Sequence, residues 1–269
     1  MKSNLAERAG QSLAAVRKQR ALVHNITNYV VMDFSANALL AIGASPVMAH
    51  AAEEVQEMVA LAGALVINIG TLSSPWIEAM FVAGREAKVR GVPIVLDPVG
   101  AGATRMRTET ALKLIEEVKP SVVRGNASEI LSLARAGGET RGVDSTRGVD
   151  EAQATAMQLA SAWGTCVAVT GAEDFITDGK RCFMVGNGDV LMGRVTGTGC
   201  VATALTGAVL AVEKDAAVAA ANALVIYGVA GELAAADRPR PGTFRTRLID
   251  ALDEITPEMV VSRAKVRES

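Results

Sequence analysis

The sequence predicts an α/β protein with a mostly parallel central sheet covered by helices on both faces. Short aliphatic runs alternate with helical segments, an order typical of repeated βαβ units. Half of the 269 residues are hydrophobic but only 3% are aromatic. Ala, Val, Leu and Ile must therefore fill the core, as they do in sheets that are buried on both faces. Because no linker or shift in composition marks a boundary, we expect one domain over residues 1–269.

The elements follow from local patterns along the chain. Alternating alanines and charged residues predict a first helix over residues 5–19. Apolar periodicity predicts further helices over residues 31–42, 52–61, 74–90, 109–118, 127–135, 151–162, 215–236 and 243–255. Short apolar runs predict strands at 44–49, 64–70, 93–97, 121–124 and 166–170, with a hairpin over 175–185. The Gly- and Arg-rich stretch 136–150 is expected to form an exposed loop.

The polar segment Val23–Tyr29 supports two interpretations. Its amide and imidazole groups could line a ligand pocket, or Thr27 or Asn28 could serve as the N-cap of the next helix. On its own, His24 is more typical of a hydrogen-bonded structural histidine than of a functional one.

The predicted strands end on residues that can bind or react, which are Met48, Asn68, Asp97, Arg124 and Thr170. In doubly wound sheets, ligands bind at the carboxyl ends of the strands. The sequence therefore predicts a functional site at this edge of the sheet.

The stretch Gly197-Thr198-Gly199-Cys200 opens a helix of small residues. Glycine lets main-chain N–H groups approach a ligand, and a helix N-terminus attracts anions, so this stretch can seat a phosphate. Cys200 would stand at the mouth of the seat, where the helix terminus favours its thiolate and a bound phosphate opposes it. A glycine turn before a buried helix, with Cys200 as a core residue, explains the same pattern.

Two further segments carry groups suited to phosphoryl transfer. Asp97 precedes a glycine-rich turn and can hold Mg²⁺, although it could also cap the turn. Arg124 offers a planar fork of donors to phosphates. Asn126 and Glu129 have the spacing of a capping box, and Glu129 could instead bind magnesium or its waters. Phosphoryl transfer needs little beyond such positioning and charge neutralisation.

Composition excludes several classes of protein. A net charge of −2 argues against nucleic acid or an anionic membrane as the main partner. Three scattered cysteines indicate neither a disulfide framework nor a zinc site, and suit a reducing cytoplasm. The run Gly100-x-Gly102 has Arg105 where a dinucleotide site has its third glycine. We expect a cytoplasmic protein that binds small molecules.

Several motifs carry a resemblance to a known family. They are His24-Asn-Ile-Thr-Asn-Tyr29, Gly43-Ala-Ser-Pro-Val-Met48, Asp97-Pro-Val-Gly-Ala-Gly-Ala-Thr104, Arg124-Gly-Asn-Ala-Ser-Glu129, Val169-Thr-Gly171 and Thr196-Gly-Thr-Gly-Cys200. Together they resemble the hydroxyethylthiazole kinase family of the ribokinase-like superfamily, from about residue 10 to residue 255. The first motif and the cysteine after G-T-G, where most superfamily members carry aspartate, are the family-specific marks.

The resemblance implies a three-layer ribokinase-like fold without a large lid. It implies that ATP, with Mg²⁺, phosphorylates the hydroxyl of 4-methyl-5-(2-hydroxyethyl)thiazole in thiamine salvage. By this resemblance Arg124 and Thr170 bind ATP, and Met48 and Gly197 contact the thiazole, with Asn25 lining the same pocket. From the residues themselves we expect Gly197, Thr198 and Gly199 at the phosphates of ATP and Asp97 and Glu129 at the metal. We expect Cys200 to act as general base or hydroxyl-orienting group. Homotrimers with sites between subunits are typical of the family.

Three alternatives remain open at this point. The chain could be another ribokinase-like kinase, such as one for a hydroxymethylpyrimidine, although Cys200 and the H-N-I-T-N segment count against this. It could be an ATP-dependent dehydratase of damaged nicotinamide cofactors, for which aspartate is expected in place of Cys200. It could also be a catalytically silent protein that binds thiazole or thiamine.

Overall fold

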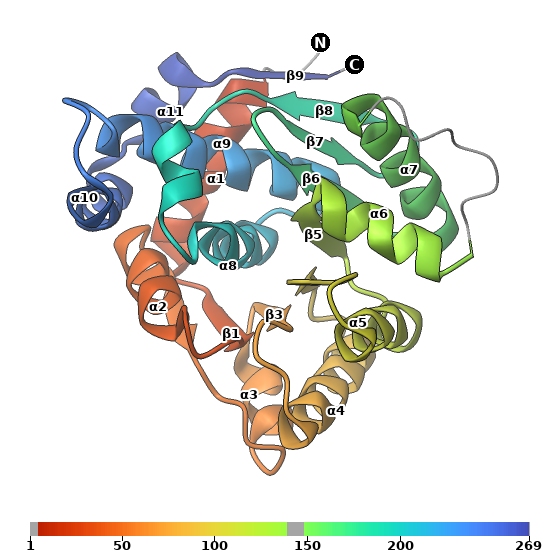
Figure 1. Cartoon of the computed structure of the whole chain (residues 1–269). Coiled ribbons are helices and arrows are strands. Elements are labelled where there is room, and N and C mark those ends of the chain that lie inside the picture. Colours follow the sequence, from red (N-terminus) through yellow and green to blue (C-terminus); the bar gives the residue numbers. More distant parts are fainter. Residues whose placement is uncertain (1–4, 139–147, 269) are drawn as a thin grey trace.

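The computed structural model describes residues 5–138 and 148–268, and its centre is a single nine-stranded sheet (Figure 1). The strand order is β2-β1-β3-β4-β5-β6-β7-β8-β9. The strands are β1 (Leu22–Ile26), β2 (Ser45–Val47), β3 (Ala64–Asn68), β4 (Ile94–Asp97), β5 (Val122–Asn126), β6 (Cys166–Thr170), β7 (Asp174–Thr177), β8 (Cys182–Val185) and β9 (Val266–Glu268). Neighbours from β2 to β6 are parallel, and β7, β8 and β9 add antiparallel pairs at one side.

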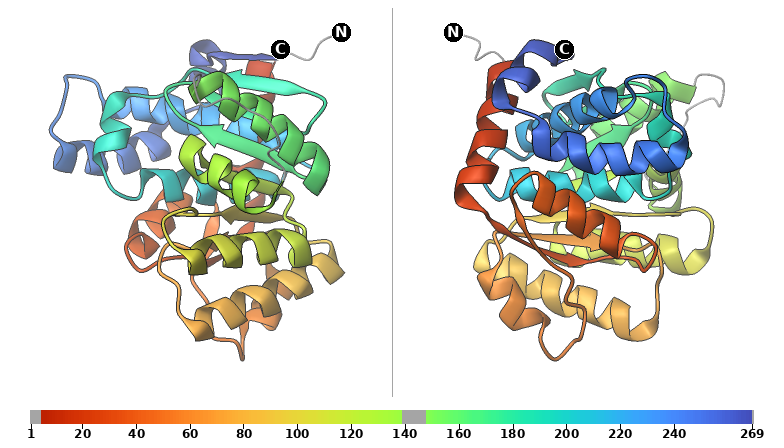
Figure 2. Two further views of the ribbon diagram at one scale, coloured as in Figure 1. Left: turned by 45° about the vertical axis from the view of Figure 1, so that its right-hand side comes forward. Right: turned by 90° about the vertical axis from the view of Figure 1, so that its left-hand side faces the viewer.

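Helices cover both faces of the sheet and so make three layers (Figure 2). One face carries α8 (Thr198–Leu210) and α9 (Ala216–Ala234), with α1 (Leu5–Gln19), α2 (Met32–Ala41), α10 (Pro241–Glu254) and α11 (Pro257–Arg263) around them. The other face carries α3 (Val55–Leu61), α4 (Ser74–Arg90), α5 (Arg105–Val118), α6 (Ala127–Ala136) and α7 (Gly148–Trp163). Side chains alternate between two cores, since Val95 packs into the first and Leu96 into the second.

The fold class and most elements predicted from the sequence are confirmed. Helices 5–19 and 74–90 and strand 166–170 have the expected bounds. The hairpin prediction is confirmed by β7 and β8, which pair in antiparallel fashion. Helix α5 begins one turn earlier than expected, at Arg105, because Thr104 caps it by accepting a hydrogen bond from the Arg107 N–H. Helix α3 begins at Val55 and is shorter than expected.

The polar segment after the first helix is the main correction. Residues 22–26 form β1, which lies between β2 and β3. His24 and Asn25 are buried in this strand although they are polar. The segment therefore lacks both the apolar run and the polar–apolar alternation by which a strand is recognised in a sequence. The N-cap of α2 is Val31, without a side-chain cap, so the prediction that Thr27 or Asn28 caps this helix is wrong.

Two other regions bear on the predictions. Most of the expected loop 136–150 lies outside the described residues, as α6 ends at Ala136 and α7 begins at Gly148. Helix α9 is long and apolar enough to cross a membrane by composition, but 83% of its most apolar window is buried inside the fold. That burial is typical of a core helix.

Candidate active site

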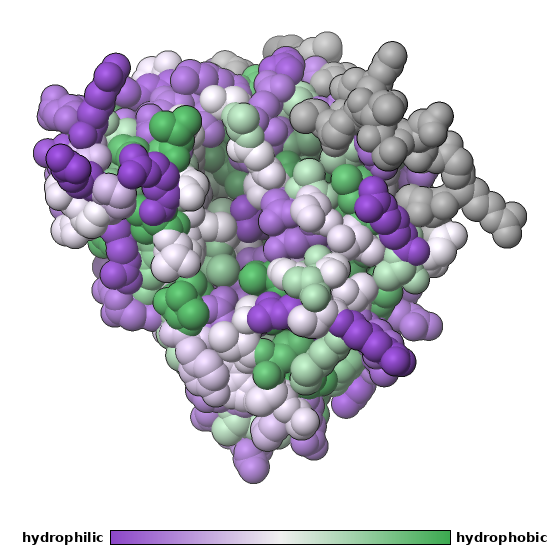
Figure 3. Space-filling view, viewed as in Figure 1, coloured by the Kyte–Doolittle hydropathy of each residue, from purple (hydrophilic) through white to green (hydrophobic). Residues whose placement is uncertain are grey.

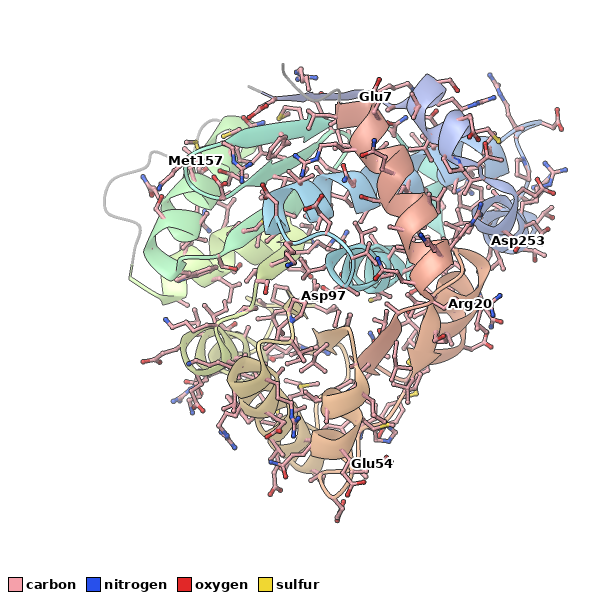
Figure 4. All side chains as sticks on the ribbon, turned by 180° about the vertical axis from the view of Figure 1, so that it is seen from behind. Glu7, Arg20, Glu54, Asp97, Met157 and Asp253 are labelled. Carbon is pink, nitrogen blue, oxygen red and sulfur yellow. The ribbon has the colours of Figure 1, made fainter. Side chains whose placement is uncertain are left out.

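The carboxyl ends of the parallel strands bring the predicted site residues to one edge of the sheet. Register places Asn68 on β3 opposite Asp97 on β4, and Asn126 on β5 opposite Thr170 on β6. Seen from behind, Asp97 lies at the centre of the molecule, whereas Glu7, Glu54 and Asp253 lie at its periphery (Figure 4). The strand order therefore arranges the candidate groups in a row along this edge.

Helix α8 points its N-terminus at the middle of the row. Its N-cap, Gly197, has a φ of 90° and provides no side-chain cap. The first helical hydrogen bond is donated by the Val201 N–H to the Gly197 carbonyl. The N–H groups of the first turn are thus left for a ligand, together with the positive end of the helix dipole. This geometry suits an anion, and the anion seat stays a prediction.

Arg124 is held rigidly beside this seat. Its Nη1 donates to the Gly199 carbonyl at 3.0 Å, and its Nη2 donates to Thr170 Oγ1 at 2.6 Å. Its Nε is buried without a partner. A Cβ at Gly199 would stand 3.0 Å from Arg124 Nη1, so glycine gives the guanidinium its room. The arginine is a preorganised cation with unused donor capacity.

A cavity of about 550 Å³ opens next to Arg124, and its lining includes Thr170, Thr198, Gly199 and Tyr227. Figure 3 shows this face of the molecule hollowed near its middle, with both hydrophilic and hydrophobic residues around the hollow. Four of the five residues predicted to bind ATP thus line one cavity, and Gly197 stands next to it as the N-cap of α8.

Two polar side chains that the sequence did not single out also line the cavity. The Tyr227 hydroxyl is buried without a hydrogen-bond partner. Asp174 accepts a hydrogen bond from the Gly171 N–H at 3.0 Å. Burial raises the pKa of Asp174 to about 6. No sequence motif marked these two residues, because only the packing of α9 and β7 brings them to the cavity.

Asp97 is almost fully buried where β4 ends. Its Oδ2 accepts hydrogen bonds from Asn68 Nδ2 and from Thr203 Oγ1, both at 2.8 Å, and lies 4.0 Å from Arg124 Nη1. Burial raises its pKa to about 6 against the influence of Arg124. Both hydrogen bonds that the described residues donate to this carboxylate end on Oδ2. Its other oxygen is left for a cation.

Glu129 joins two loops at the same edge. Its Oε1 accepts from the Gly100 N–H and its Oε2 from the Asn126 N–H, each at 2.8 Å. Asn126 caps α6 in return, so the predicted capping box is confirmed. The structural interpretation of Glu129 is therefore correct, and each oxygen keeps a lone pair for a metal ion or its waters.

The donor set near Asp97 and Glu129 fits Mg²⁺ rather than a transition metal. The described residues contain no cluster of three or more His, Cys, Asp or Glu side chains that could hold a metal. Magnesium commonly binds to one or two carboxylates and takes its remaining ligands from waters and substrate phosphates. Asp97 and Glu129 could supply the carboxylates, and a phosphate bound at the N-terminus of α8 could supply a further ligand.

Cys200 lies in the first turn of α8, half-buried, and its Sγ accepts a hydrogen bond from Asn28 Nδ2 at 3.5 Å. Burial, and next the charge of Asp97, raise the pKa of this thiol to about 11. The expectation that the helix terminus favours a thiolate is therefore wrong for the protein without ligands. Loss of solvation and the nearby Asp97 charge both disfavour the thiolate, so the sulfur is a neutral thiol near pH 7.

Two of the three residues predicted to contact the thiazole, Met48 and Asn25, lie away from the cavity, whereas Gly197 stands next to it as the N-cap of α8. Met48 follows β2 and is half-buried, while Asn25 is buried in β1. Neither lines the cavity beside Arg124. Asn25 donates to the Val23 carbonyl, and its own carbonyl oxygen is buried without a partner. Asn28 belongs to the same segment and had no predicted role in the site, yet it is the residue whose side chain reaches Cys200.

Tyr29, the residue after Asn28, belongs to a group of three packed aromatic rings. Trp76, from α4, lies between Tyr29 and His50, with ring centroids 4.6 Å and 4.5 Å away. Trp76 is 5% exposed, whereas Tyr29 is 64% exposed.

Solved structures with this fold are ribokinase-like. A ribokinase-like superfamily protein from Enterococcus faecalis superposes with a TM-score of 0.62 at 15% identity, covering 90% of this chain and 89% of that one. Pyridoxal kinase from Staphylococcus aureus gives 0.58 at 15% identity, covering 79% and 88%. The chain therefore has the ribokinase-like fold, the class that its three layers and strand-end site define.

The family follows from closer matches. Residues 13–258 match the hydroxyethylthiazole kinase family, and the chain belongs to that family. Hydroxyethylthiazole kinase from Desulfotalea psychrophila is 51% identical over 99% of this chain and 98% of its own length. The solved structure of hydroxyethylthiazole kinase from Pyrococcus horikoshii superposes with a TM-score of 0.90 at 49% identity, covering 97% of this chain and 99% of that one.

Proposed function

We propose that this protein transfers the γ-phosphoryl group of ATP to the hydroxyl of 4-methyl-5-(2-hydroxyethyl)thiazole. One observation supports this most directly, which is the order of groups along the sheet edge. The cavity with Arg124 lies on one side of the α8 N-terminus and Cys200 faces the other side, with Asp97 between them. A donor, a metal holder and an acceptor-side group in a row suit phosphoryl transfer.

ATP would occupy the cavity, with its phosphates at the N-terminus of α8. Arg124 and the first-turn N–H groups of Thr198, Gly199 and Cys200 would neutralise phosphate charge. Thr170 supports this by holding the guanidinium through its hydroxyl. Because these donors are already fixed by the fold, little reorganisation is needed when charge shifts during transfer.

Asp97 and Glu129 would hold Mg²⁺, which neutralises phosphate charge when bound. Asp97 must be ionised to do so, and burial works against its ionisation. Hydrogen bonds from Asn68 and Thr203 hold the carboxylate and favour its charged form. Arg124 adds a positive charge at 4.0 Å.

Cys200 would orient the alcohol. A thiol with a pKa of about 11 is protonated at neutral pH, so it acts as a hydrogen-bonding group rather than as a thiolate base. Its position in the first turn of α8 would bring the sulfur next to the transferred group. Met48, Gly197 and Asn25 would contact the thiazole on this side.

The acceptor side is open in the single chain, with Tyr29 and Val30 64% and 62% exposed. We include in the proposal that a homotrimer completes this side with residues of a neighbouring subunit. We also include that the enzyme is a single-domain cytoplasmic protein.

The experiment that tests the function is ADP release from ATP and Mg²⁺ with and without hydroxyethylthiazole, using hydroxymethylpyrimidine as the control acceptor. Release that depends on the thiazole alcohol supports the proposal. Release only with the pyrimidine contradicts the substrate. No release with either acceptor contradicts the kinase activity, and binding of thiazole by calorimetry in that case identifies a silent binder.

A further inference from the structure

A continuous set of hydrogen bonds runs from Cys200 into the protein interior. Asn28 Nδ2 lies 3.5 Å from Cys200 Sγ and 2.8 Å from Asn68 Oδ1, and Asn68 Nδ2 lies 2.8 Å from Asp97 Oδ2. Asn28, Asn68 and Asp97 are 4%, 1% and 1% exposed. Asn68 and Asp97 end the neighbouring strands β3 and β4, and Asn28 lies two residues after β1, the other neighbour of β3.

The orientation of the Asn28 amide is set by its other contact. Its Oδ1 accepts a hydrogen bond from the Val30 N–H at 3.1 Å, so the opposite orientation would set two donors against each other. The amide nitrogen therefore faces inward, and its two hydrogens go to Asn68 and to Cys200. Because the sulfur accepts from Asn28, the S–H hydrogen of Cys200 is directed to a different acceptor.

Gly70 removes the remaining freedom of this amide. A Cβ at Gly70 would stand 2.6 Å from Asn28 Nδ2, so the backbone of Gly70 packs directly against the amide. The Gly70 N–H also donates to Asn68 Oδ1 at 3.0 Å, the same oxygen that Asn28 contacts. Asn28 is thus enclosed by Asn68, Gly70 and Cys200.

We propose that Asn28 is a positioning residue for phosphoryl transfer, which holds the Cys200 sulfur and directs its S–H toward the acceptor alcohol. The idea rests on the proposed function for its kinetic consequence, but the contact itself exists without substrate. Positioning errors of about 1 Å cost on the order of 100-fold in rate, so a hydrogen bond that fixes the sulfur has a measurable effect.

The kinetic test uses Asn28→Asp, which keeps the acceptor for Val30 but removes both donors. We expect kcat to fall by about 10- to 100-fold while the KM for ATP stays within about twofold. Asn37→Asp is the matched control, because Asn37 is exposed on α2 and its side chain donates its hydrogen bonds to Asp33 on the same helix. Gly70→Ala should reproduce the fall in kcat by displacing the Asn28 amide, without changing its chemistry. Equal kcat in Asn28→Asp, Gly70→Ala and the wild type would overturn the proposal.

A double-mutant cycle separates positioning from a general structural role. If Asn28 acts through the sulfur, Asn28→Ala combined with Cys200→Ala is no slower than Cys200→Ala alone. Additive losses would contradict the proposal. Thermal unfolding of each variant confirms that the compared proteins are folded.

A substrate-free test keeps this inference independent of the proposed function. The rate of Cys200 alkylation by iodoacetamide at pH 8.5 is followed by the mass of its peptide. The charged groups that already face the sulfur are Asp97 and Arg124, with the Tyr227 hydroxyl beyond them. The carboxylate of Asn28→Asp would disfavour the thiolate, so we expect alkylation to slow by about tenfold relative to Asn37→Asp.

The two arms fail in different ways. Unchanged alkylation in Asn28→Asp shows that Asn28 does not hold the sulfur, and overturns the inference whatever the activity. If the wild type shows no thiazole-dependent ADP release, the proposed function fails, and slowed alkylation would still establish the contact between Asn28 and Cys200.

Discussion

The two sides of the α8 N-terminus are built differently. On the side that we propose for the nucleotide, Arg124, Thr170 and Tyr227 line a cavity that one chain forms by itself, and Tyr227 is only 3% exposed. On the acceptor side, Tyr29 and Val30 remain largely exposed. The side proposed for the nucleotide is therefore preorganised. On the side proposed for the acceptor, the hydrogen-bonded pair Asn28 and Cys200 lies near exposed side chains that nothing in the single chain covers. Substitutions on the two sides should have separable effects on ATP and on the alcohol.

The largest expected effect is on the nucleotide side. Arg124→Ala removes the donors to Gly199 and Thr170 together with the cation of the phosphate site. We expect kcat/KM for ATP to fall by about 1000-fold, the size of loss that follows removal of a preorganised charge-stabilising donor. The KM for the thiazole alcohol should change by less than about twofold. Steady-state kinetics with each substrate varied in turn measures both values, and a matching rise in the KM for the alcohol would break the comparison.

On the acceptor side, Cys200→Ala should lower kcat by about 100-fold, near the low end for a proton-handling or orienting group. The thiol is protonated at neutral pH, so a larger, base-like loss is not expected. Thiazole affinity, measured by calorimetry, should change much less than turnover. Cys200→Ser is expected to retain part of the activity, because a hydroxyl also orients an alcohol. Unchanged turnover in Cys200→Ala would remove the sulfur from the mechanism.

Gly197 lies where the two sides meet. Replacing it should lower the free energy of unfolding more than replacing a glycine of similar conformation elsewhere in the chain. Its φ is 90°, and an added Cβ would stand 2.7 Å from Val31 Cγ1. Gly91 has a φ of 70° with no atom within 4 Å of an added Cβ. We expect Gly197→Ala to cost about 3 kcal/mol of unfolding free energy and Gly91→Ala about 1 kcal/mol. If urea denaturation gives equal losses of unfolding free energy for the two variants, the Val31 side chain moves aside at no measurable cost.

The smallest effect concerns pH. The pKa of Asp97 is raised from 3.8 to about 6, so the folded protein takes up a proton between about pH 6 and pH 4 where the unfolded chain does not. Stability should therefore rise as the pH falls through this window. Activity should move the opposite way, by about tenfold per pH unit below 6, because cation binding needs the ionised carboxylate.

Asp174 provides the control for the pH profile, since burial also raises its pKa to about 6. Asp174→Asn retains an acceptor for the Gly171 N–H and cannot ionise. If activity still falls below about pH 6 in this variant, the fall is assigned to Asp97. Its disappearance would assign the fall to the nucleotide side instead.

Much of the fold was readable from the sequence because its strands are short aliphatic runs bounded by turns. The strand Leu22–Ile26 was not, since His24 and Asn25 are buried where a strand usually carries apolar side chains. The closing strand Val266–Glu268 was also missed, because a three-residue charged segment has no strand pattern and pairs only through its backbone with β8. Tertiary context decided both cases.

Sequence motifs identified individual residues of the candidate site, but not the contacts between them. The structure brings Arg124, Thr170, Thr198 and Gly199 to one cavity, as expected. The sequence could not reveal that Asn28 reaches Cys200, because this contact depends on the order of β1, β3 and β4 in the sheet. The raised pKa of Cys200 depends on burial, which the helix-terminus argument did not include.

The placement of the tryptophans has an optical consequence. Trp76 stands between the rings of Tyr29 and His50 on the acceptor side, and the protein's other tryptophan, Trp163, packs from α7 against the second core. Tryptophan emission responds to its immediate neighbours. A Trp163→Phe protein would therefore carry a single tryptophan, packed against Tyr29, and we expect binding of the thiazole on the proposed acceptor side to change its fluorescence before any phosphoryl group has moved.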